Sequence, residues 1–407
     1  GQPVNDSTDS ASTPPRVTLL PGKSRLFYSR HPWVFPGAIS HFEDGIPDGS
    51  LVQLVSHTGN FVGWGFYNAK SRVRVRLHSW EKGQPPGPSL WRDRIRAAIR
   101  LRRDLGLMNP EGACRLINSE GDHFSGLVVD RFGRWLSVQA SSLGLSQRLE
   151  EILDILMDET ACLGIIQRQD KEMARLEGID PFEGLCRGQS PPERLQFQEH
   201  GLTIGVNLVE GQKTGYYLDQ RDNRLAAAAL AKGRSVLDAF TYAGGFAMRA
   251  AFAGARSVIA VDQSQNALEM ATANSQANGL ADIISFKKAE VFEDLSERVE
   301  SGEQFGLVIL DPPKFARGKN RVEEALRGYR RLFTLAFRLT EEDGRIVLCS
   351  CTGSVTKDML LDLISQVAAE ERKDARIIRA AGAAPDHPVA TSCPESDYLK
   401  CFILAVS

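Results

Sequence analysis

The chain has 407 residues, of which 42% are hydrophobic and 25% charged, with a formal net charge of −2 and seven cysteines. Since a domain averages about 150 residues, this length predicts two or three soluble domains. The near-neutral net charge gives no global field that would attract nucleic acid, although a local basic patch can exist on a protein of small net charge. An odd cysteine count without a CxxC pair argues against a disulfide framework or a zinc finger and favours the reducing cytoplasm. The lack of an apolar run of about 20 residues argues against a membrane span.

The first 84 residues divide into a tail and a small β domain. Residues 1–15, GQPVNDSTDSASTPP, lack the basic and apolar regions of a signal peptide, and their Ser, Thr, Asp and Pro content predicts a disordered tail. Short apolar runs at 51–56, 61–67 and 72–78, separated by turns, predict a β-barrel over 16–84. The third run alternates, and its cationic face suits RNA phosphates and equally suits solvent. That face consists of Arg72, Arg74, Arg76 and His78.

Basic and aromatic residues are interleaved at 22–37, GKSRLFYSRHPWVFPG. Such a mixture can hold a nucleic-acid backbone through its cations and stack on bases through its rings. We expect most of the rings to fill the barrel core and the cations to contact RNA. The aromatic residues are Phe27, Tyr28, Trp33 and Phe35, and the candidate RNA-binding cations are Lys23, Arg25 and Arg30.

The middle of the chain, 85–200, has the pattern of an α+β domain. A QPPGP linker at 84–88 precedes an arginine-rich helical stretch at 89–107. The remaining predictions are strands at 115–119, 127–131, 135–140 and 164–168, a helix at 146–160, a loop at 178–192, and a hairpin joining 195–199 to 202–208.

From 201 to 407 helices and strands alternate, which predicts a parallel, doubly wound sheet in an α/β domain. The predicted helices are 220–232, 267–278, 321–339 and 357–370, and the later strands are 283–287, 307–310, 345–349 and 398–406. We expect the last of these strands to form an antiparallel edge of the sheet.

The segment 235–263, SVLDAFTYAGGFAMRAAFAGARSVIAVDQ, has the order strand, glycine turn, helix, strand, acid. This order begins a nucleotide-binding βαβ unit, in which the turn approaches the ligand and the final acid binds ribose hydroxyls. Tyr242 stands where the dinucleotide pattern G-x-G-x-x-G needs small residues, so S-adenosylmethionine (SAM) fits better than a dinucleotide. The alternative is an ordinary α/β core unit with a glycine turn.

Two further strands end in polar residues. The strand 307–310 is followed by Asp311-Pro312-Pro313-Lys314, and 345–349 by Ser350-Cys351-Thr352-Gly353. Because ligands bind at the carboxyl ends of strands in such sheets, an acid beside carbonyls without competing donors suits the polar edge of a flat base. The alternatives are a plain turn at Asp311 and a small buried residue at Cys351.

Several motifs in the same order resemble those of the SAM-dependent rRNA methyltransferases that make 5-methylcytosine in large-subunit (23S) rRNA. These motifs are KTGYYLDQRDNR (213–224), DAFTYAGGF, DPPKF, SCTG, DHPV (386–389) and YLKCF (398–402), and RHPWVFPGAI (30–39) resembles the PUA domain of that family. The resemblance implies a Rossmann-like class I methyltransferase domain at 201–407, a PUA-like RNA-binding domain at 16–84, SAM as cofactor and 23S rRNA as partner.

The resemblance also implies a role for individual residues. Cys351 would add to cytosine C6 and make C5 nucleophilic, with Cys349 as the rival thiol, and Asp311 would hydrogen-bond N3 or N4 of the ring. Pro313 stands where other RNA cytosine-C5 methyltransferases have a second cysteine, so the base that removes the C5 proton has no assignment. The expected cofactor-binding residues are Asp238, Phe240, Tyr242, Gly244, Gly245, Asp262, Gln263, Glu290, Asp311 and Pro312. The expected substrate-binding residues, besides the N-terminal cations, are Tyr217, Gln220, Arg221, Pro313 and Lys314.

Three other functions compete with cytosine-C5 methylation. Methylation of a guanine amino group would use the same fold without a thiol, and a non-catalytic assembly factor would bind RNA without SAM. A small-molecule methyltransferase would not need the two N-terminal domains. We interpret His387 as part of a structural turn in preference to a catalytic group, expect no metal, and leave the oligomeric state, a homodimer included, open.

Overall fold

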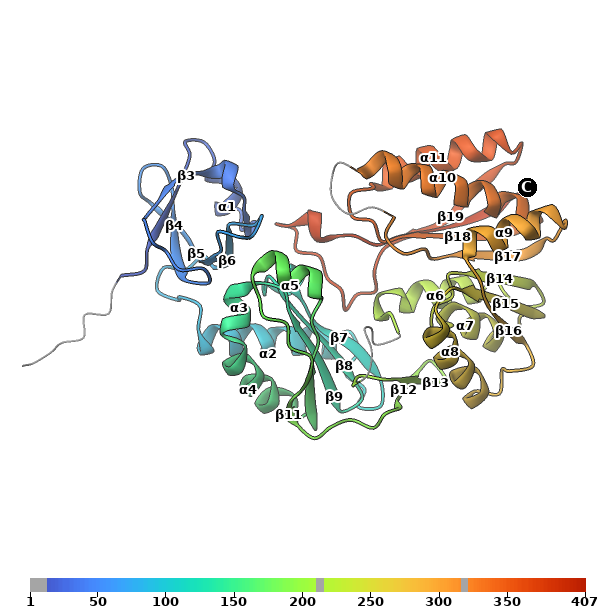
Figure 1. Ribbon diagram of the computed structural model, residues 1–407, viewed down its shortest axis with the longest axis horizontal. Helices are drawn as coiled ribbons and strands as arrows, with labels where there is room; N and C mark the ends of the chain where they lie inside the picture. Colours follow the sequence, from blue (N-terminus) through green and yellow to red (C-terminus); the bar gives the residue numbers. More distant parts are fainter. Residues whose placement is uncertain (1–12, 210–215, 316–320) are drawn as a thin grey trace, which may run out of the picture.

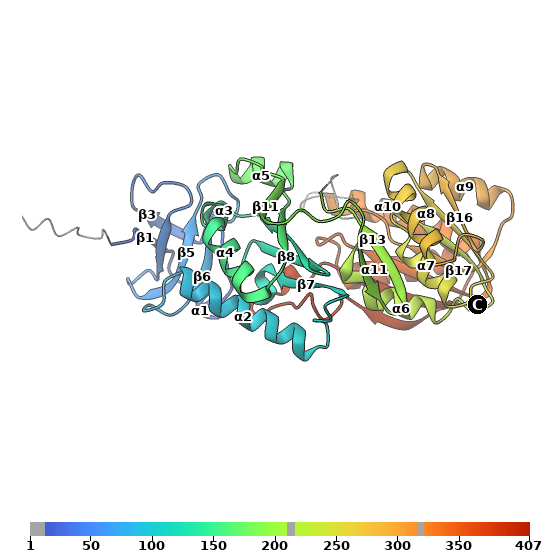
Figure 2. The ribbon, with the colours of Figure 1, turned by 90° about the horizontal axis from the view of Figure 1, so that it is seen from below.

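The computed structural model describes residues 13–209, 216–315 and 321–407. Most of the predicted tail, 1–12, and the start of the KTGYYLDQRDNR motif, 213–215, lie outside this part. The described chain forms three units that follow one another from the N-terminus to the C-terminus (Figures 1 and 2). No helix in the described ranges has the length and apolar character needed to cross a membrane.

The N-terminal unit is a six-stranded sheet with the order β2-β6-β5-β4-β1-β3. Its strands are β1 (Arg16–Leu19), β2 (Trp33–Val34), β3 (Ile39–Phe42), β4 (Leu51–Val55), β5 (Phe61–Tyr67) and β6 (Val75–Ser79), with the short helix α1 (Arg25–Tyr28). The predicted strands at 51–56 and 61–67 are confirmed, whereas the third begins at Val75 because 71–74 form bends.

The predicted cationic face is divided: Arg72 is exposed, whereas Arg76 and His78 lie against the next unit, which corrects the expectation for these two residues. His78 is buried against Trp91 and Phe124 of the next unit, and burial lowers its pKa to about 3. The Arg76 guanidinium lies within 3.9 Å of the carboxylates of Glu120 and Glu177. Arg76 and His78 therefore belong to the surface on which the N-terminal unit docks against the central unit.

The central unit is a five-stranded sheet with the order β11-β10-β9-β8-β7. Its strands are β7 (Ala113–Asn118), β8 (Leu127–Phe132), β9 (Trp135–Ala140), β10 (Gly164–Gln167) and β11 (Gly184–Gly188), and its helices are α2 (Pro88–Asp104), α3 (Leu143–Gln147), α4 (Leu149–Thr160) and α5 (Lys171–Glu177). Helices α2 and α4 share one hydrophobic core with the strands. The loop predicted at 178–192 is wrong over β11, because its two glycines conceal a short strand that pairs with β10.

The hairpin of β12 (Leu195–Glu199) and β13 (Leu202–Val206) is confirmed, with Leu195 opposite Val206. Its apolar residues belong to a core shared with the C-terminal unit. The expected domain division between 200 and 201 therefore passes through one hairpin.

The C-terminal unit is a seven-stranded sheet with the order β16-β15-β14-β17-β18-β20-β19. Its strands are β14 (Ser235–Ala239), β15 (Ser257–Asp262), β16 (Ile284–Lys288), β17 (Phe305–Leu310), β18 (Thr340–Ser350), β19 (Ala375–Ala381) and β20 (Lys400–Val406). Its helices are α6 (Arg221–Ala228), α7 (Gly245–Phe252), α8 (Gln265–Ala277), α9 (Val291–Glu300), α10 (Val322–Leu339) and α11 (Lys357–Glu370).

Each face of this sheet has its own core, as a doubly wound fold requires. Val236 of β14 packs in the core that contains α7, and its neighbour Leu237 packs in the core that contains α10 and α11. The α/β fold class, with a β unit and an α+β unit before it, is confirmed.

The position of the last strand differs from the prediction. β20 is antiparallel, as expected, but it lies between β18 and β19 and is not the edge. Its sequence KCFILAV is almost continuously apolar and buried, which is typical of a strand covered on both faces. The edge strand is β19, whose Ile377 and Ile378 are exposed.

Candidate active site

The parallel strands β14, β15, β17 and β18 end along one edge of the C-terminal sheet, and an acid or a cysteine stands at the end of each. The loop after β14 is conformationally unusual, with a φ of 61° at Phe240, 52° at Tyr242 and 80° at Gly244. At Gly244 an added Cβ would lie 3.0 Å from the Cβ of Ala271, so only glycine suits both the angle and the space. Left-handed non-glycine residues of this kind concentrate at ligand sites.

Asp238 ends β14 as a buried acid that is only half satisfied. Its Oδ2 accepts hydrogen bonds from Thr241 Oγ1 (2.7 Å) and from the backbone N–H of Ala247 (3.0 Å). Its Oδ1 is buried and has no hydrogen-bond partner among the described residues. Burial raises the pKa of Asp238 to about 7. A cationic ligand would supply the missing partner and return the carboxyl to its charged form.

Asp262 ends the neighbouring strand β15 as a buried carboxylate at the same edge. Its Oδ2 accepts from the N–H of Tyr242 (2.9 Å) and its Oδ1 from the N–H of Ser264 (2.8 Å). These bonds fix the carboxylate and leave lone pairs for two adjacent hydroxyl groups. Gln263, next in the chain, is exposed.

Glu290 follows β16 and caps helix α9, where its carboxylate accepts from the N–H of Glu293 (2.7 Å). The backbone N–H of Ala289 donates to the carbonyl of Asp262 (3.0 Å), so the two acids lie at neighbouring strand ends. One exposed carboxylate oxygen remains for a ligand.

Asp311 and Cys351 meet across the next two strand ends. The Cys351 sulfur lies 3.9 Å from the carbonyl oxygen of Pro312, on the loop after β17. Burial and the negative charges of Asp311 and Asp219 raise the pKa of Cys351 to about 11, while burial and Asp219 raise that of Asp311 to about 7. The resting thiol is therefore protonated, and it must lose its proton before it can act as a nucleophile.

The rival thiol, Cys349, is in a different environment. It is 2% exposed, packs in the core and faces Cys401 on β20. The contact with Cys401 and burial raise its pKa well above the usual range. Of the two thiols, only the half-buried Cys351 is accessible at the edge of the sheet.

The turn that holds Cys351 is fixed by two residues that the sequence did not single out. Lys400 donates from Nζ to the carbonyls of Thr352 (2.8 Å) and Val355 (2.7 Å). The Tyr329 hydroxyl lies 2.8 Å from the hydroxyls of Ser350 and Thr352. Of these two residues, only Lys400 could have been noticed in the sequence, because it lies in YLKCF, one of the motifs that resemble the methyltransferase family.

The YYLDQR segment lies beside this pair. The Tyr217 ring is 46% exposed, lies 5.3 Å from the ring of Tyr242, and has its pKa raised by burial of its hydroxyl and by Tyr242, Asp311 and Cys351. It can therefore stack on a base that enters the site. Gln220 is buried next to Asp311, whereas Pro313 and Lys314 are exposed on the loop that follows Asp311.

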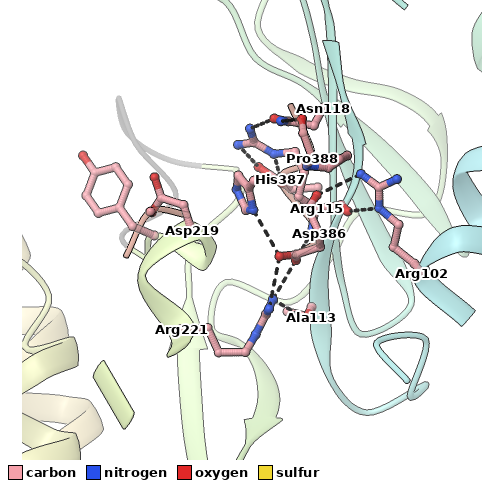
Figure 3. A network of polar contacts seen from close by, with 12 residues as sticks. Arg102, Ala113, Arg115, Asn118, Asp219, Arg221, Asp386, His387 and Pro388 are labelled. Atoms are coloured by element: carbon pink, nitrogen blue, oxygen red, sulfur yellow. Dashed lines mark hydrogen bonds and ion pairs between the residues drawn. The ribbon is translucent and has the colours of Figure 1, made fainter. Parts of the chain in front are cut away.

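Arg221 is buried, in contrast to its expected role as a substrate contact. Its guanidinium donates to both oxygens of Asp386, at 2.7 and 3.1 Å (Figure 3). Hydrogen bonds from His387 and Arg221 overcome the effect of burial and hold the pKa of Asp386 well below its usual range. The structure thus places Arg221 in an interior ion pair and not on a surface that RNA reaches.

The same DHPV segment joins the C-terminal unit to the central unit. Arg102 of α2 donates to the Asp386 carbonyl (2.8 Å), and the N–H of Arg115 donates to its carboxylate (2.8 Å). The N–H₂ of Asn118 donates to the carbonyl of Pro388 (3.1 Å). His387 is buried with its Nδ1 3.1 Å from Asp386, which is the environment of a structural residue.

The candidate RNA-binding cations Lys23, Arg25 and Arg30 are exposed on the N-terminal unit, about α1. The expectation that most neighbouring aromatics fill the core is only half right. Phe27 is buried, but Tyr28 is 49% and Phe35 43% exposed. Exposed rings beside exposed cations form a surface suited to single-stranded nucleic acid.

One group of potential metal ligands occurs in the described residues: His31, Cys393 and Glu395. His31 Nδ1 accepts from the N–H of Trp33 (3.1 Å), so Nε2 carries the proton and donates to Glu395 at 3.1 Å. Burial raises the pKa of Cys393 to about 12. The His31–Glu395 bond ties the N-terminal unit to the β19–β20 connection.

The comparisons with known proteins agree with this geometry. Residues 17–80 match the PUA-like domain family, and residues 183–391 match the S-adenosylmethionine-dependent methyltransferase family. The chain is therefore a SAM-dependent methyltransferase with a PUA-like domain, and SAM is its cofactor.

The relatives define the family more narrowly. Ribosomal RNA large subunit methyltransferase I of Erwinia tasmaniensis is 35% identical over 392 residues, which cover 96% of this chain and 99% of the relative. The chain belongs to this methyltransferase family.

Two solved structures share the fold. A SAM-dependent methyltransferase from Streptococcus mutans has a TM-score of 0.83 at 20% identity, and a methyltransferase complexed with SAH has a TM-score of 0.84 at 21% identity. Each comparison covers 96% of this chain and 99% of the other.

The residues at the strand ends fit SAM. The unpartnered Oδ1 of Asp238 suits the ammonium group of the methionine part, and Asp262 suits the ribose hydroxyls. Glu290 retains an acceptor for the adenine amino group.

Proposed function

We propose that the protein methylates C5 of a cytosine in large-subunit (23S) rRNA through a covalent bond between Cys351 and C6 of the ring, and that it acts in the cytoplasm. The observation that carries the proposal is the position of the Cys351 thiol beside the Asp311-Pro312 loop, at the strand ends that suit SAM. The similarity to ribosomal RNA large subunit methyltransferase I supports the choice of RNA.

The chemistry explains why a thiol is needed. Cytosine C5 is a weak nucleophile, and addition of the Cys351 sulfur to C6 turns the C5–C6 unit into an enamine. Asp311, whose pKa is about 7, can donate a proton or a hydrogen bond to N3 as the ring gains electron density. Bound SAM supplies an electrophilic methyl group.

The other residues have roles of binding and positioning. Asp238, Asp262 and Glu290 hold the three parts of SAM, and the loop 240–245 with Gln263 and Pro312 lines its site. Tyr217 stacks on the extruded base, while Gln220, Pro313 and Lys314 surround it. The exposed cations Lys23, Arg25 and Arg30, with Tyr28 and Phe35, bind the RNA outside the active site.

The test is methyl transfer from labelled SAM to undermodified 23S rRNA, followed by nucleoside analysis. Wild type and Cys349→Ala should produce 5-methylcytosine, and Cys351→Ala should produce none. A methylated guanine amine made equally by Cys351→Ala would contradict the proposal and favour the amino-group reaction. RNA binding without methyl transfer by the wild type would favour an assembly factor.

A further inference from the structure

Cytosine-C5 methylation needs a base that the residues assigned above do not supply. After methylation C5 carries both a methyl group and its original proton, and the C6–S bond cannot break until that proton leaves. Asp311 is engaged with N3, and Lys314 is a cation at this site. The base must be another group near Cys351.

Asp219 is a buried carboxylate whose second oxygen has no partner. It lies in the turn η3 (Leu218–Gln220), where its backbone carbonyl accepts from the N–H of Ala384 (2.9 Å). Its side chain is held by the Tyr398 hydroxyl, which donates to Oδ2 at 2.6 Å. Asp219 is 9% exposed, and its Oδ1 is buried with no hydrogen-bond partner among the described residues.

The turn η3 places this carboxylate between Tyr217, whose ring contacts that of Tyr242, and Gln220, which hydrogen-bonds Asp311. The negative charge of Asp219 acts on both Asp311 and Cys351, and also on the ring hydroxyl of Tyr217. Figure 3 shows Asp219 beside the interdomain network but outside its ion pairs. A buried acceptor is usually satisfied, because an unpaired one is destabilising, so a free oxygen on the segment that borders Asp311 calls for a functional explanation.

We propose that Asp219 is the base that removes the C5 proton, an inference that rests on the cytosine-C5 chemistry proposed above. Asp219 Oδ1 takes the proton from C5, the C–H electron pair forms the C5–C6 double bond, and the C6–S bond breaks. Cys351 leaves as a thiolate, and the proton ends on Asp219. The hydrogen bond from Tyr398 fixes the carboxylate so that Oδ1 is the basic oxygen.

The alternatives among the nearby groups are less suitable. Asp238 is turned toward Thr241 and Ala247, at the part of the rim that suits the methionine of SAM. Cys349 is in the core against Cys401. The Tyr398 hydroxyl already donates a hydrogen bond to Asp219.

The experiment follows two labels on one RNA: methyl transfer from SAM, and release of tritium from C5 of the target cytosine. Asp219→Asn should transfer about one methyl group per enzyme and then stop, with tritium release slowed about 100-fold or more, the usual contribution of a general base. The stalled protein should remain attached to RNA on a denaturing gel. The adduct should be absent from the double variant Asp219→Asn, Cys351→Ala.

Two further variants control for structure. Asp222→Asn removes the acid that lies three residues after Asp219, in the first turn of α6, and this variant should behave as wild type. Tyr398→Phe keeps the carboxylate but frees Oδ2, and it should slow tritium release more than methyl transfer. This variant tests the proposal even where Asp219→Asn does not fold.

The outcomes separate this inference from the proposed function. If Asp219→Asn turns over like wild type, or if it loses the first methyl transfer without forming an adduct, Asp219 is not the base. In the second case its role is to bind the cytosine. If the wild type releases no tritium and makes no 5-methylcytosine, the proposed function itself fails.

Discussion

Two regions of this methyltransferase contain buried aspartates whose hydrogen bonding differs. At the strand ends Asp238 lacks a partner for one oxygen, and its pKa is raised to about 7. In the interdomain network Asp386 receives two bonds from Arg221 and one from the N–H of Arg115, and its pKa is held low. A buried acid with a complete set of donors supports the fold, whereas one with a free oxygen is available to a ligand.

The largest effect that would test this comparison is on stability. Asp386→Ala leaves the guanidinium of Arg221 buried without its counter-ion, so the free energy of unfolding should fall by about 3–5 kcal/mol. Denaturant titration measures it, with the exposed Asp358→Ala as the matched control. A loss below about 1 kcal/mol would mean that the network does not support the fold.

The next effect is on catalysis. Asp311→Asn retains the shape of the side chain but not its acid, and the methylation rate should fall about 100-fold because proton donation to the ring is lost. The pH dependence of kcat near pH 7, where Asp311 titrates, should disappear with it. If stability changes and the rate does not, Asp311 belongs with the structural acids.

A smaller effect concerns pH and SAM together. The Asp238 carboxyl has a pKa of about 7 in the folded protein and about 4 when unfolded. Between these values the folded state binds more protons than the unfolded state, so stability falls as pH rises from about 4 to 7 and is level above 7. The stability conferred by Asp386 has the opposite sign: it is present above about pH 4 and is lost as pH falls.

Asp238→Asn should therefore flatten the fall between pH 4 and 7 and make the SAM-free protein more stable at pH 8 than the wild type. The same change should weaken SAM binding by about tenfold or more, because a neutral amide cannot pair with an ammonium group. Thermal unfolding at pH 5 and 8, with and without SAM, measures both. Tighter SAM binding would show that the free oxygen does not face the cofactor.

The smallest expected effect is at the N-terminal surface. Lys23→Ala should weaken RNA binding only a few-fold and reduce the salt slope by about one unit, without changing stability or kcat. Arg221→Ala should do the reverse and destabilise the protein with no change in the salt slope. Equal salt effects of the two variants would contradict the assignment of Arg221 to the interior.

The comparison also shows where sequence-based reasoning succeeded. The acids Asp238, Asp262 and Asp311 and the thiol of Cys351 were placed at one edge of the sheet from the sequence. Each directly follows or ends an apolar strand, and parallel strands bring their carboxyl ends together whatever else the chain does. The glycine turn was equally readable, because its conformation depends on the residues of the turn itself.

Where it failed, the deciding contact was distant in sequence. Arg221 pairs with Asp386, 165 residues away, and Arg76 with Glu177 of another unit, so these two arginines are neutralised by acids of the protein itself. The position of the edge strand β19, which carries the exposed Ile377 and Ile378, also depends on distant contacts. Strand order is set by pairing across the sheet, and β19 pairs with β20.

The sequence by itself determined most of the elements, their order along the chain and the chemistry at the strand ends, because these follow from local periodicity and from the geometry of parallel strands. Only the tertiary structure decided which charges remain free. Whether an acid is paired or has a free oxygen depends on what the fold brings against it: Asp386 lies at the centre of the interdomain network with its partners, and Asp219 lies beside the network with one oxygen free.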